Sequence, residues 1–426
     1  MRFNTLQQWL DWQAELHPSE IELGLERVST VWSQLHSKKF PVPVISVAGT
    51  NGKGSSVAML ESIARAAGYR TGCYTSPHLV RYNERIRIDG EEATDQQICN
   101  AFQRVDEARQ SRPLTYFEFG TLAALDIFAS AGLDLVILEV GLGGRLDAVN
   151  IIDPDVALIT TVDIDHADWL GDTREAIGRE KAGIMRPGVP AVCATPNPPV
   201  SVRKHAETIG ARLYVAGEAF GVHQEEQGWS WWSEQRQRRS LPQPYLRGRF
   251  QLQNAAAVLM VFQALNTLLP VDQRAVRAGL QDARVPGRFQ VLARDPLVIL
   301  DVAHNAEAAT ALASNLQDMY SSGDTCAVFA MLADKDLHQV VSVMKSRIDH
   351  WFCAPLSGPR ALDADALAAG LSSEGVSETA ITPCGTLEEA YGRARDCAGD
   401  GGRVIVFGSF LTVGGVLQLA GEEATG

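Results

Sequence analysis

The residues whose types and spacing best suit chemistry form a glycine-rich segment near the start of the chain. It follows the apolar run 43–48 and consists of Gly49, Thr50, Asn51, Gly52, Lys53, Gly54, Ser55 and Ser56. Glycines allow a tight turn that points successive backbone N–H groups at phosphate oxygens, and the start of a following helix adds partial positive charge. The lysine can reach the β- and γ-phosphates, and a serine hydroxyl can contact phosphate or metal. The spacing is not that of an ordinary Walker A motif, but strand, turn, lysine and helix together predict a nucleotide phosphate loop rather than a structural turn.

Polar side chains follow other predicted strands. Glu139 lies near the end of the apolar run 135–140, His166 follows the run 156–161, and Ser76 lies in a constrained loop. In a parallel sheet the carboxyl ends of the strands meet at one edge, where such folds bind ligands. Mg²⁺ prefers hard oxygen ligands, so Ser76 and Glu139 suit a magnesium site, whereas histidine is a softer ligand. The alternatives are that Glu139 caps a helix or forms an ion pair, and that His166 is a structural histidine.

The order of apolar and amphipathic stretches predicts the fold class. Short β-branched runs alternate with longer amphipathic stretches, which indicates βαβ units in an α/β fold, and the chain is too long for one ordinary core. We predict an N-terminal P-loop ATPase-like domain with a mostly parallel sheet over residues 1–284, a hinge linker over 285–296, and a smaller Rossmann-like domain over 297–426. The predicted strands are 44–47, 135–140, 156–161, 189–193, 298–300, 326–330, 350–353 and 403–407. The predicted helices include 55–67, 118–130, 174–185, 306–319, 337–347 and 387–396.

The overall composition argues against several classes of function. A formal net charge of −13 disfavours general affinity for nucleic acid or anionic membrane. The N-terminus lacks the apolar core of a signal peptide, and polar residues interrupt the two long uncharged segments 250–271 and 404–421. We interpret the first segment as a buried helix and the second as a buried strand followed by a packed helix.

Seven scattered cysteines without a CxxC pair fit free thiols in a reducing cytoplasm. The Trp- and Arg-containing segment 228–240 is interpreted as an exposed hairpin rather than a platform for single-stranded nucleic acid.

The phosphate loop also resembles a known family. Gly-Thr-Asn-Gly-Lys-Gly-Ser at 49–55 is similar to the nucleotide loop of the Mur ligase superfamily, specifically of its folate branch. The resemblance extends from Ile-Glu-Leu-Gly-Leu-Glu-Arg-Val at 21–28 to Phe-Gly-Ser-Phe at 407–410, and so covers essentially the whole chain. It implies an enzyme that uses ATP and two Mg²⁺ ions to join L-glutamate to dihydropteroate and to reduced folates through an acyl phosphate. It also implies small-molecule partners, with no nucleic acid or membrane, and we expect a cytoplasmic monomer.

Three alternatives stay open. The chain could be an enzyme that only lengthens the glutamate tail of folates, or a nucleotide-gated regulatory protein with a degenerate ligase fold. A cell-wall Mur ligase has little support, because the phosphate loop begins near residue 49 and leaves no room ahead of it for a UDP-binding domain.

The resemblance assigns roles to particular residues. Catalytic roles are implied for Lys53, Glu139, His166 and Lys181, and metal ligation for Ser76, Glu139, His166 and a carbamylated Lys181. Nucleotide contacts beyond the loop are implied for Asn254, Arg288, Asp301 and His304, each of which could instead be a cap or turn residue. Candidate substrate contacts are Arg27, Pro77, His78, Arg81, Asn83, Glu84, Arg85, Tyr116, Phe117, Glu118, Asp147 and Asn150. The chain departs from the family pattern at Gln290, Ala306 and Leu411, which affects the expected details of the second substrate site and not the reaction class.

Overall fold

The computed structural model describes residues 2–19, 21–36, 40–226, 228–358 and 360–425. The chain divides into two compact units. The first comprises Met1–His78, Tyr82–Tyr245 and Gln251–Arg284, and the second comprises Leu79–Arg81, Leu246–Phe250 and Val285–Gly426.

The first unit is built on an eight-stranded sheet with the order β4-β3-β2-β5-β1-β6-β7-β8. Neighbouring strands pair in parallel along the series β2-β5-β1-β6-β7-β8. Strands β3 and β4 extend the sheet beyond β2 in antiparallel pairing. This pairing confirms the predicted mostly parallel sheet. The prediction rested on apolar runs, which are typical of parallel strands buried on both faces. The strands are β1 (Val44–Ala48), β2 (Thr71–Tyr74), β3 (Ile86–Ile88), β4 (Glu91–Glu92), β5 (Leu135–Glu139), β6 (Val156–Ile159), β7 (Pro190–Cys193) and β8 (Arg212–Val215).

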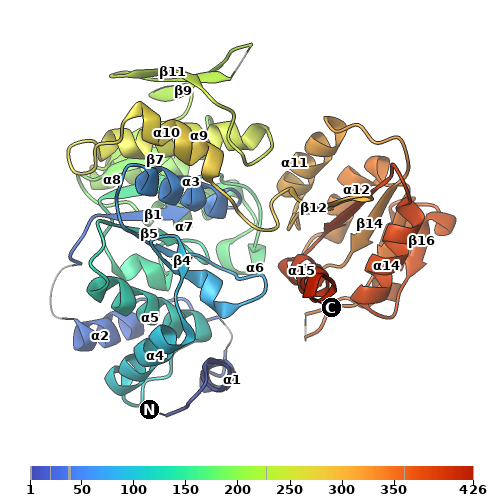
Figure 1. The fold of residues 1–426 in the computed structure, drawn as a ribbon. Coiled ribbons are helices and arrows are strands. Elements are labelled where there is room, and N and C mark those ends of the chain that lie inside the picture. Colours follow the sequence, from blue (N-terminus) through green and yellow to red (C-terminus); the bar gives the residue numbers. More distant parts are fainter. Residues whose placement is uncertain (1, 20, 37–39, 227, 359, 426) are drawn as a thin grey trace. The chain divides into compact units, whose positions relative to one another are not determined.

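Helices cover both faces of this sheet, with α3 and α10 on one face and α4 and α5 on the other (Figure 1). The helix α3 begins directly after the glycine-rich turn, and α10 packs so closely on it that a Cβ on Gly279 would lie 2.5 Å from Ile63 Cα. The segment 250–271 contains the buried helix that was predicted. The helices are α1 (Leu6–Leu16), α2 (Glu26–Leu35), α3 (Lys53–Ala66), α4 (Asp95–Arg109), α5 (Tyr116–Ser130), α6 (Ala167–Leu170), α7 (Arg174–Ala182), α8 (Val200–Ile209), α9 (Arg249–Ala264) and α10 (Gln273–Asp282), with 3₁₀ turns η1 (Tyr82–Arg85) and η2 (Ala148–Ile151).

A small antiparallel sheet contains the segment rich in tryptophan and arginine. Its strands are β9 (Phe220–Gln224), β10 (Trp229–Ser233) and β11 (Gln237–Leu241). The predicted hairpin is present, but the prediction that it is exposed is wrong for the tryptophans at its start. Trp229 and Trp231 are fully buried, and Trp231 Nε1 donates a hydrogen bond to the Ala256 carbonyl of α9 at 3.0 Å. Their indole rings therefore serve the protein core and leave no stacking surface for bases.

The second unit has a six-stranded sheet with the order β12-β13-β17-β14-β15-β16, in which β12 alone is antiparallel to its neighbour among the described strands. One core on this sheet includes side chains of α11, α12 and α13, and the core on the other face includes those of α14 and α15. The strands are β12 (Gln290–Arg294), β13 (Leu297–Leu300), β14 (Thr325–Phe329), β15 (His350–Cys353), β16 (Ile381–Pro383) and β17 (Arg403–Phe407). The helices are α11 (Ala306–Gln317), α12 (Leu337–Met344), α13 (Ala364–Ser373), α14 (Leu387–Ala398) and α15 (Phe410–Thr425), with η3 (Lys345–Arg347) and η4 (Glu378–Ala380).

Two predictions from the sequence concern segments of this unit. The segment 404–421 contains a buried strand followed by a packed helix, as predicted. The segment 285–296, expected to be a hinge linker, differs from that expectation because Gln290–Arg294 forms β12 and pairs with β13. Among the described residues, no helix combines the length and apolar character that crossing a bilayer requires.

Candidate active site

The glycine-rich turn between β1 and α3 is held in place by the end of the neighbouring strand β6. Thr50 N donates to the Thr161 carbonyl and Asn51 N donates to Thr161 Oγ1, both at 2.9 Å. Thr160 Oγ1 donates to the Asn51 carbonyl at 2.6 Å. A Cβ on Gly49 would lie 1.8 Å from Thr160 Oγ1, so the close approach of the two strand ends requires glycine at position 49. The two threonines were not predicted as site residues, although they end the predicted strand 156–161 at the expected edge of the sheet.

Lys53 lies over this turn. Its Nζ donates to the carbonyls of Gly49, at 2.9 Å, and Thr50, at 3.2 Å. Gly52 has a left-handed φ of 83°, which glycine adopts without steric cost and which directs the chain into α3. The turn therefore has the tight glycine conformation and the lysine position of a phosphate loop.

Two amides of α9 cover the same turn. A Cβ on Gly52 would lie 2.8 Å from Asn254 Oδ1, which brings the predicted nucleotide residue Asn254 to the loop. Gln251 Nε2 donates to Ser55 Oγ at 3.3 Å, and Gln251 Oε1 accepts from Asn254 Nδ2 at 3.2 Å. Gln251 was not predicted. Its position one helical turn before Asn254 is the signal that could have identified it.

The four candidate metal ligands come from four segments of the first unit. Glu139 ends β5 and is buried, and its Oε2 accepts a hydrogen bond from Ser76 N at 3.3 Å. His166 caps α6 in a left-handed conformation, and Lys181 is buried in α7. The helix α7 packs on the glycine loop after β5, where a Cβ on Gly144 would lie 3.3 Å from Lys181 Cα. The structure thus joins Ser76 to Glu139 directly and brings Lys181 to the loop that follows Glu139.

Ser76 and Glu139 offer hard oxygen donors of the kind that Mg²⁺ and Mn²⁺ prefer. No group of three or more His, Cys, Asp or Glu side chains within the described ranges could hold a metal ion by itself. Mg²⁺ is typically bound by one or two protein carboxylates together with waters and substrate phosphates. A buried carboxylate and a hydroxyl beside a phosphate loop match that requirement.

The loop after β2 and the start of α5 bring several predicted substrate residues together. Arg85 Nε donates to His78 Nδ1 at 2.8 Å, and the Arg85 guanidinium lies 5.4 Å and 5.6 Å from the ring centres of Tyr82 and Tyr116. Burial, together with the Arg85 charge, lowers the pKa of His78 to about 4, so His78 is neutral at pH 7. Phe117 is half-buried and lies so close to Gly141 that a Cβ there would be 2.6 Å from the ring. These residues form a cationic and aromatic cluster near the end of β5.

Other predicted substrate residues have structural partners. Arg27 forms an ion pair with Glu118 at 2.8 Å, and Glu118 Oε2 also accepts from Thr115 N at 2.8 Å in the capping box of α5. Asn83 is buried and donates to the Ala93 carbonyl and to Asp95 Oδ1. Glu84 lies in the 3₁₀ turn η1. The side chains of Pro77 and Arg81 are exposed to solvent. Arg27, Glu118 and Asn83 therefore hold helices and loops in position.

Asp147 and Asn150 lie in the loop and turn after β5. Asp147 accepts hydrogen bonds from Leu142 N at 2.8 Å and Val149 N at 3.0 Å, and burial raises the pKa of its carboxyl group to about 7. Asn150 Nδ2 donates to the carbonyls of Arg145 and Gly183, both at 3.0 Å. The Asn150 amide protons are therefore used within the protein, which favours a structural role over the predicted substrate contact.

We expect Asp147 to make the nucleotide-free protein less stable as the pH rises from about 4 to about 7. The unfolded carboxyl loses its proton near pH 4, whereas the folded group keeps it up to about pH 7. The stabilisation is therefore fully present below the unfolded pKa and is lost as the pH rises through the folded one, by at most about 1.4 kcal/mol per pH unit. Thermal unfolding of the Asp147→Asn variant should show a shallower fall with pH over this range. An identical pH slope in both proteins would contradict the prediction.

Two of the candidate nucleotide residues of the second unit, Arg288 and His304, lie near the ring of Phe410. Asp301 follows β13 and accepts from Phe289 N and Ala303 N, both at 2.9 Å, while His304 Nδ1 lies 2.8 Å from the Val302 carbonyl. Desolvation raises the pKa of Asp301, and the charge of Arg288 opposes this rise. The Phe410 ring centre lies 5.5 Å from the Arg288 guanidinium and 5.9 Å from the His304 ring. The structure brings Arg288, Asp301 and His304 together and adds Phe410, which was not predicted as a site residue.

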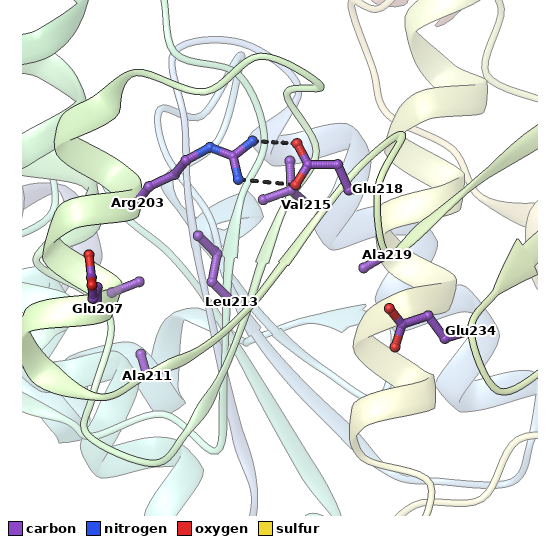
Figure 2. A pocket seen from close by; sticks show the side chains of 9 residues that line it. Arg203, Glu207, Ala211, Leu213, Val215, Glu218, Ala219 and Glu234 are labelled. Atoms are coloured by element: carbon purple, nitrogen blue, oxygen red, sulfur yellow. Dashed lines mark hydrogen bonds and ion pairs between the residues drawn. The ribbon is translucent and has the colours of Figure 1, made fainter.

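One cavity lies outside these clusters, between α8, β8 and the turn before β9 (Figure 2). It has a volume of about 490 Å³, and its wall includes an exposed ion pair between Arg203 and Glu218. None of its lining residues is a predicted site residue, and its charged groups are solvated. The phosphate-loop region is therefore the stronger candidate for the active site.

Comparisons with known proteins show which families the chain is similar to. The model of the Mur ligase middle domain matches residues 47–262, and that of the Mur ligase glutamate ligase domain matches residues 287–410. The dihydrofolate synthase/folylpolyglutamate synthase of Escherichia coli K12 is 42% identical over 422 residues, which cover 99% of this chain and 97% of that protein. A structure of E. coli FolC in complex with DHPP and ADP has a TM-score of 0.94 at 41% identity and covers 99% of both chains. The bifunctional enzyme from Yersinia pestis, complexed with AMPPNP and Mn ion, has a TM-score of 0.90 at 45% identity and covers 98% of both chains.

Proposed function

This chain belongs to the Mur ligase family, in its dihydrofolate synthase/folylpolyglutamate synthase branch, and from that premise we propose the reaction that its site performs. The chain is an ATP-dependent ligase that forms carbon–nitrogen bonds, adding L-glutamate to dihydropteroate and further glutamates to reduced folates. ATP and a divalent metal ion take part. The observation that carries the proposal is the phosphate loop, with Lys53 over a turn that Thr160 and Thr161 hold against the end of β6. It occurs in a chain that both Mur ligase domain models match.

A carboxylate is a poor acyl donor, so the ligase must activate it before an amine can attack. We propose that the substrate carboxylate attacks the γ-phosphorus of ATP, which gives an acyl phosphate and ADP. The glutamate amine then attacks the acyl carbon, loses a proton, and expels phosphate to leave the amide. The backbone N–H groups of Gly52 and Gly54 would hold the β-phosphate, since those of Thr50 and Asn51 donate to Thr161. Lys53 would compensate the charge on the transferred phosphoryl group. No covalent bond to the enzyme is required.

We propose Ser76 and Glu139 as ligands of Mg²⁺, supported by the hydrogen bond that the Ser76 backbone N–H donates to the Glu139 carboxylate. His166 and Lys181 would complete a second metal position. The metal would supply positive charge that stabilises the phosphate oxygens during transfer. For the nucleotide, we propose Asn254 on the adenine side, and Arg288, Asp301 and His304 at phosphate or ribose. The cationic and aromatic cluster of Arg85, Tyr116 and Phe117 suits the carboxylates and ring of the folate substrate.

The direct test is ADP formation with ATP, Mg²⁺ and L-glutamate, comparing dihydropteroate with a reduced folate that carries one glutamate. Turnover with both acceptors is expected. Turnover with the glutamylated folate alone would reduce the activity to tail lengthening. If neither acceptor supports ADP release from a folded protein that binds ATP, the proposed ligase activity must be abandoned.

We further propose that Lys181 carries a carbamate. Carbamate formation requires a neutral amine, and burial favours that form of lysine. In protein prepared with ¹³C-bicarbonate, ¹³C NMR should show one carbamate resonance that is lost in the Lys181→Met variant. Lys204, which lies in the more exposed part of α8, offers a matched Lys204→Met control that should keep the resonance. A spectrum without a carbamate signal at neutral pH would refute the proposal.

We also propose a monomeric, cytoplasmic enzyme. The cysteines are free thiols, six of them buried, which suits a reducing compartment. A light-scattering mass of twice the chain mass would contradict the monomer.

A further inference from the structure

Two cysteines of the second unit meet where a helix packs on the sheet. Cys326 is the second residue of β14, and its side chain is fully buried in the core on the α14 face. The same core holds Ala394 and Ala398 of α14, which flank the exposed Cys397 on that helix. The helix α14 packs directly on β14, and the two elements lie side by side in Figure 1. The Cys397 thiol is also among the groups that raise the pKa of the Cys326 thiol, as expected where α14 packs on β14.

The remaining cysteines of this unit are poorly placed to compete. Cys353 and Cys384 lie on neighbouring chain segments, but their side chains enter the cores on opposite faces of the sheet. Cys384 shares a face with Cys326, yet it follows β16, which is two strands away from β14. Strands lie about 5 Å apart, so this separation is on the order of 10 Å, beyond the reach of a disulfide without backbone movement. Cys397 is therefore the favoured partner of Cys326.

We propose that Cys326 and Cys397 form an oxidation-sensitive dithiol, which a small disulfide such as oxidised glutathione converts into a disulfide that joins α14 to β14. The exposed Cys397 Sγ attacks the reagent as a thiolate and releases one molecule of thiol, which leaves a mixed disulfide on Cys397. Cys326 Sγ then attacks Cys397 Sγ and releases the second molecule. The two cysteines lose two protons and two electrons in total, and the reagent disulfide is reduced to two thiols.

The second step should be the slower one. Burial raises the pKa of the Cys326 thiol, and the nearby Asp324 and Asp349 act in the same direction, so little of it is thiolate at neutral pH. The mixed disulfide on Cys397 should accordingly accumulate first and then decay as the internal disulfide forms. Once formed, the bond closes a long loop, from residue 326 to residue 397, and is expected to raise the thermal unfolding temperature.

The test is to incubate the full chain with oxidised glutathione, alkylate the free thiols and map the peptides by mass spectrometry. The number of free thiols should fall from seven to five, because Cys326 and Cys397 pair with each other. A peptide linking Cys326 to Cys397 should appear after a transient glutathione adduct on Cys397. The Cys397→Ser variant should lose no thiol, and the Cys326→Ala variant should stop at the adduct on Cys397. A Cys384→Ala control should form the link as the parent does.

A second measurement keeps the proposal testable if the Cys326→Ala variant does not fold. Oxidation should raise the unfolding temperature of the parent and leave that of Cys397→Ser unchanged, while the reduced forms of both should release ADP at the same rate. A parent that ends as the glutathione adduct, a disulfide that uses another cysteine, or a full count of seven thiols after oxidation would each overturn the proposal.

Discussion

Replacing Lys53 with alanine is expected to lower kcat for ADP formation by about a hundredfold to a thousandfold, the usual cost of removing a preorganised group that stabilises transition-state charge. Lys53 Nζ rests on the carbonyls of Gly49 and Thr50, within the turn that would hold the phosphates. The effect should appear with dihydropteroate and with the glutamylated folate alike, because both reactions transfer the same phosphoryl group. Steady-state kinetics with each acceptor measures it.

The Lys53→Arg variant is the matched control for charge. A guanidinium keeps the positive charge but has a planar fork in place of a compact ammonium, so arginine should restore only part of the rate. Both variants should unfold near the parent temperature. An alanine variant that is properly folded and retains more than about a tenth of the parent kcat would contradict the role given to Lys53.

Replacing Gly49 with alanine is expected to weaken nucleotide binding and to destabilise the protein. The added Cβ would lie 1.8 Å from Thr160 Oγ1 and 3.2 Å from Thr161 N, so either the turn or the end of β6 must move. Forcing an extra methyl group into a packed site costs about 1–3 kcal/mol. The same movement displaces the N–H groups that would hold phosphate, so the dissociation constant for ADP should rise at least about tenfold, the equivalent of about 1.4 kcal/mol. Calorimetric titration with ADP and a thermal melt measure the two effects.

Two companion variants identify the cause. The Thr160→Ala substitution removes the nearest clashing atom, so the Gly49→Ala/Thr160→Ala double variant should regain part of the lost stability. Gly54 is the matched glycine within the same loop, because a Cβ added there would have no protein atom within 4 Å. The Gly54→Ala variant should therefore melt as the parent does. Equal destabilisation by both alanines would show that loop flexibility, and not the contact with Thr160, explains the glycine at position 49.

Local sequence patterns predicted the parts of the fold that depend on neighbouring residues. The runs before Gly49 and up to Glu139 were recognisable as strands because β-branched residues buried on both faces are typical of a parallel sheet. The phosphate loop was predictable for the same reason, since the turn, the lysine and the helix start are consecutive in the chain. The carboxyl-edge rule for parallel sheets then gave the position of Glu139 without knowledge of its contacts.

Features that depend on distant partners could not be predicted in this way. Glu118 was read as a substrate residue, but its ion pair is with Arg27, 91 positions away. Strand β12 was expected to be linker because Pro286, Gly287 and Pro296 mark its surroundings, and its strand character comes from pairing with β13. The burial of Trp229 and Trp231 likewise depends on how the small sheet packs, including the contact of Trp231 with α9.

The contact between Trp231 and α9 has a spectroscopic consequence. Gln251 and Asn254 at the start of α9 lie against the phosphate loop, and Ala256, less than one helical turn beyond Asn254, accepts the hydrogen bond from the Trp231 indole. A ligand that shifts these amides shifts the carbonyl that faces the fluorophore. The protein therefore carries an intrinsic optical reporter of its own nucleotide loop, and the difference in emission between the parent and a Trp231→Phe variant isolates that reporter from the other tryptophans.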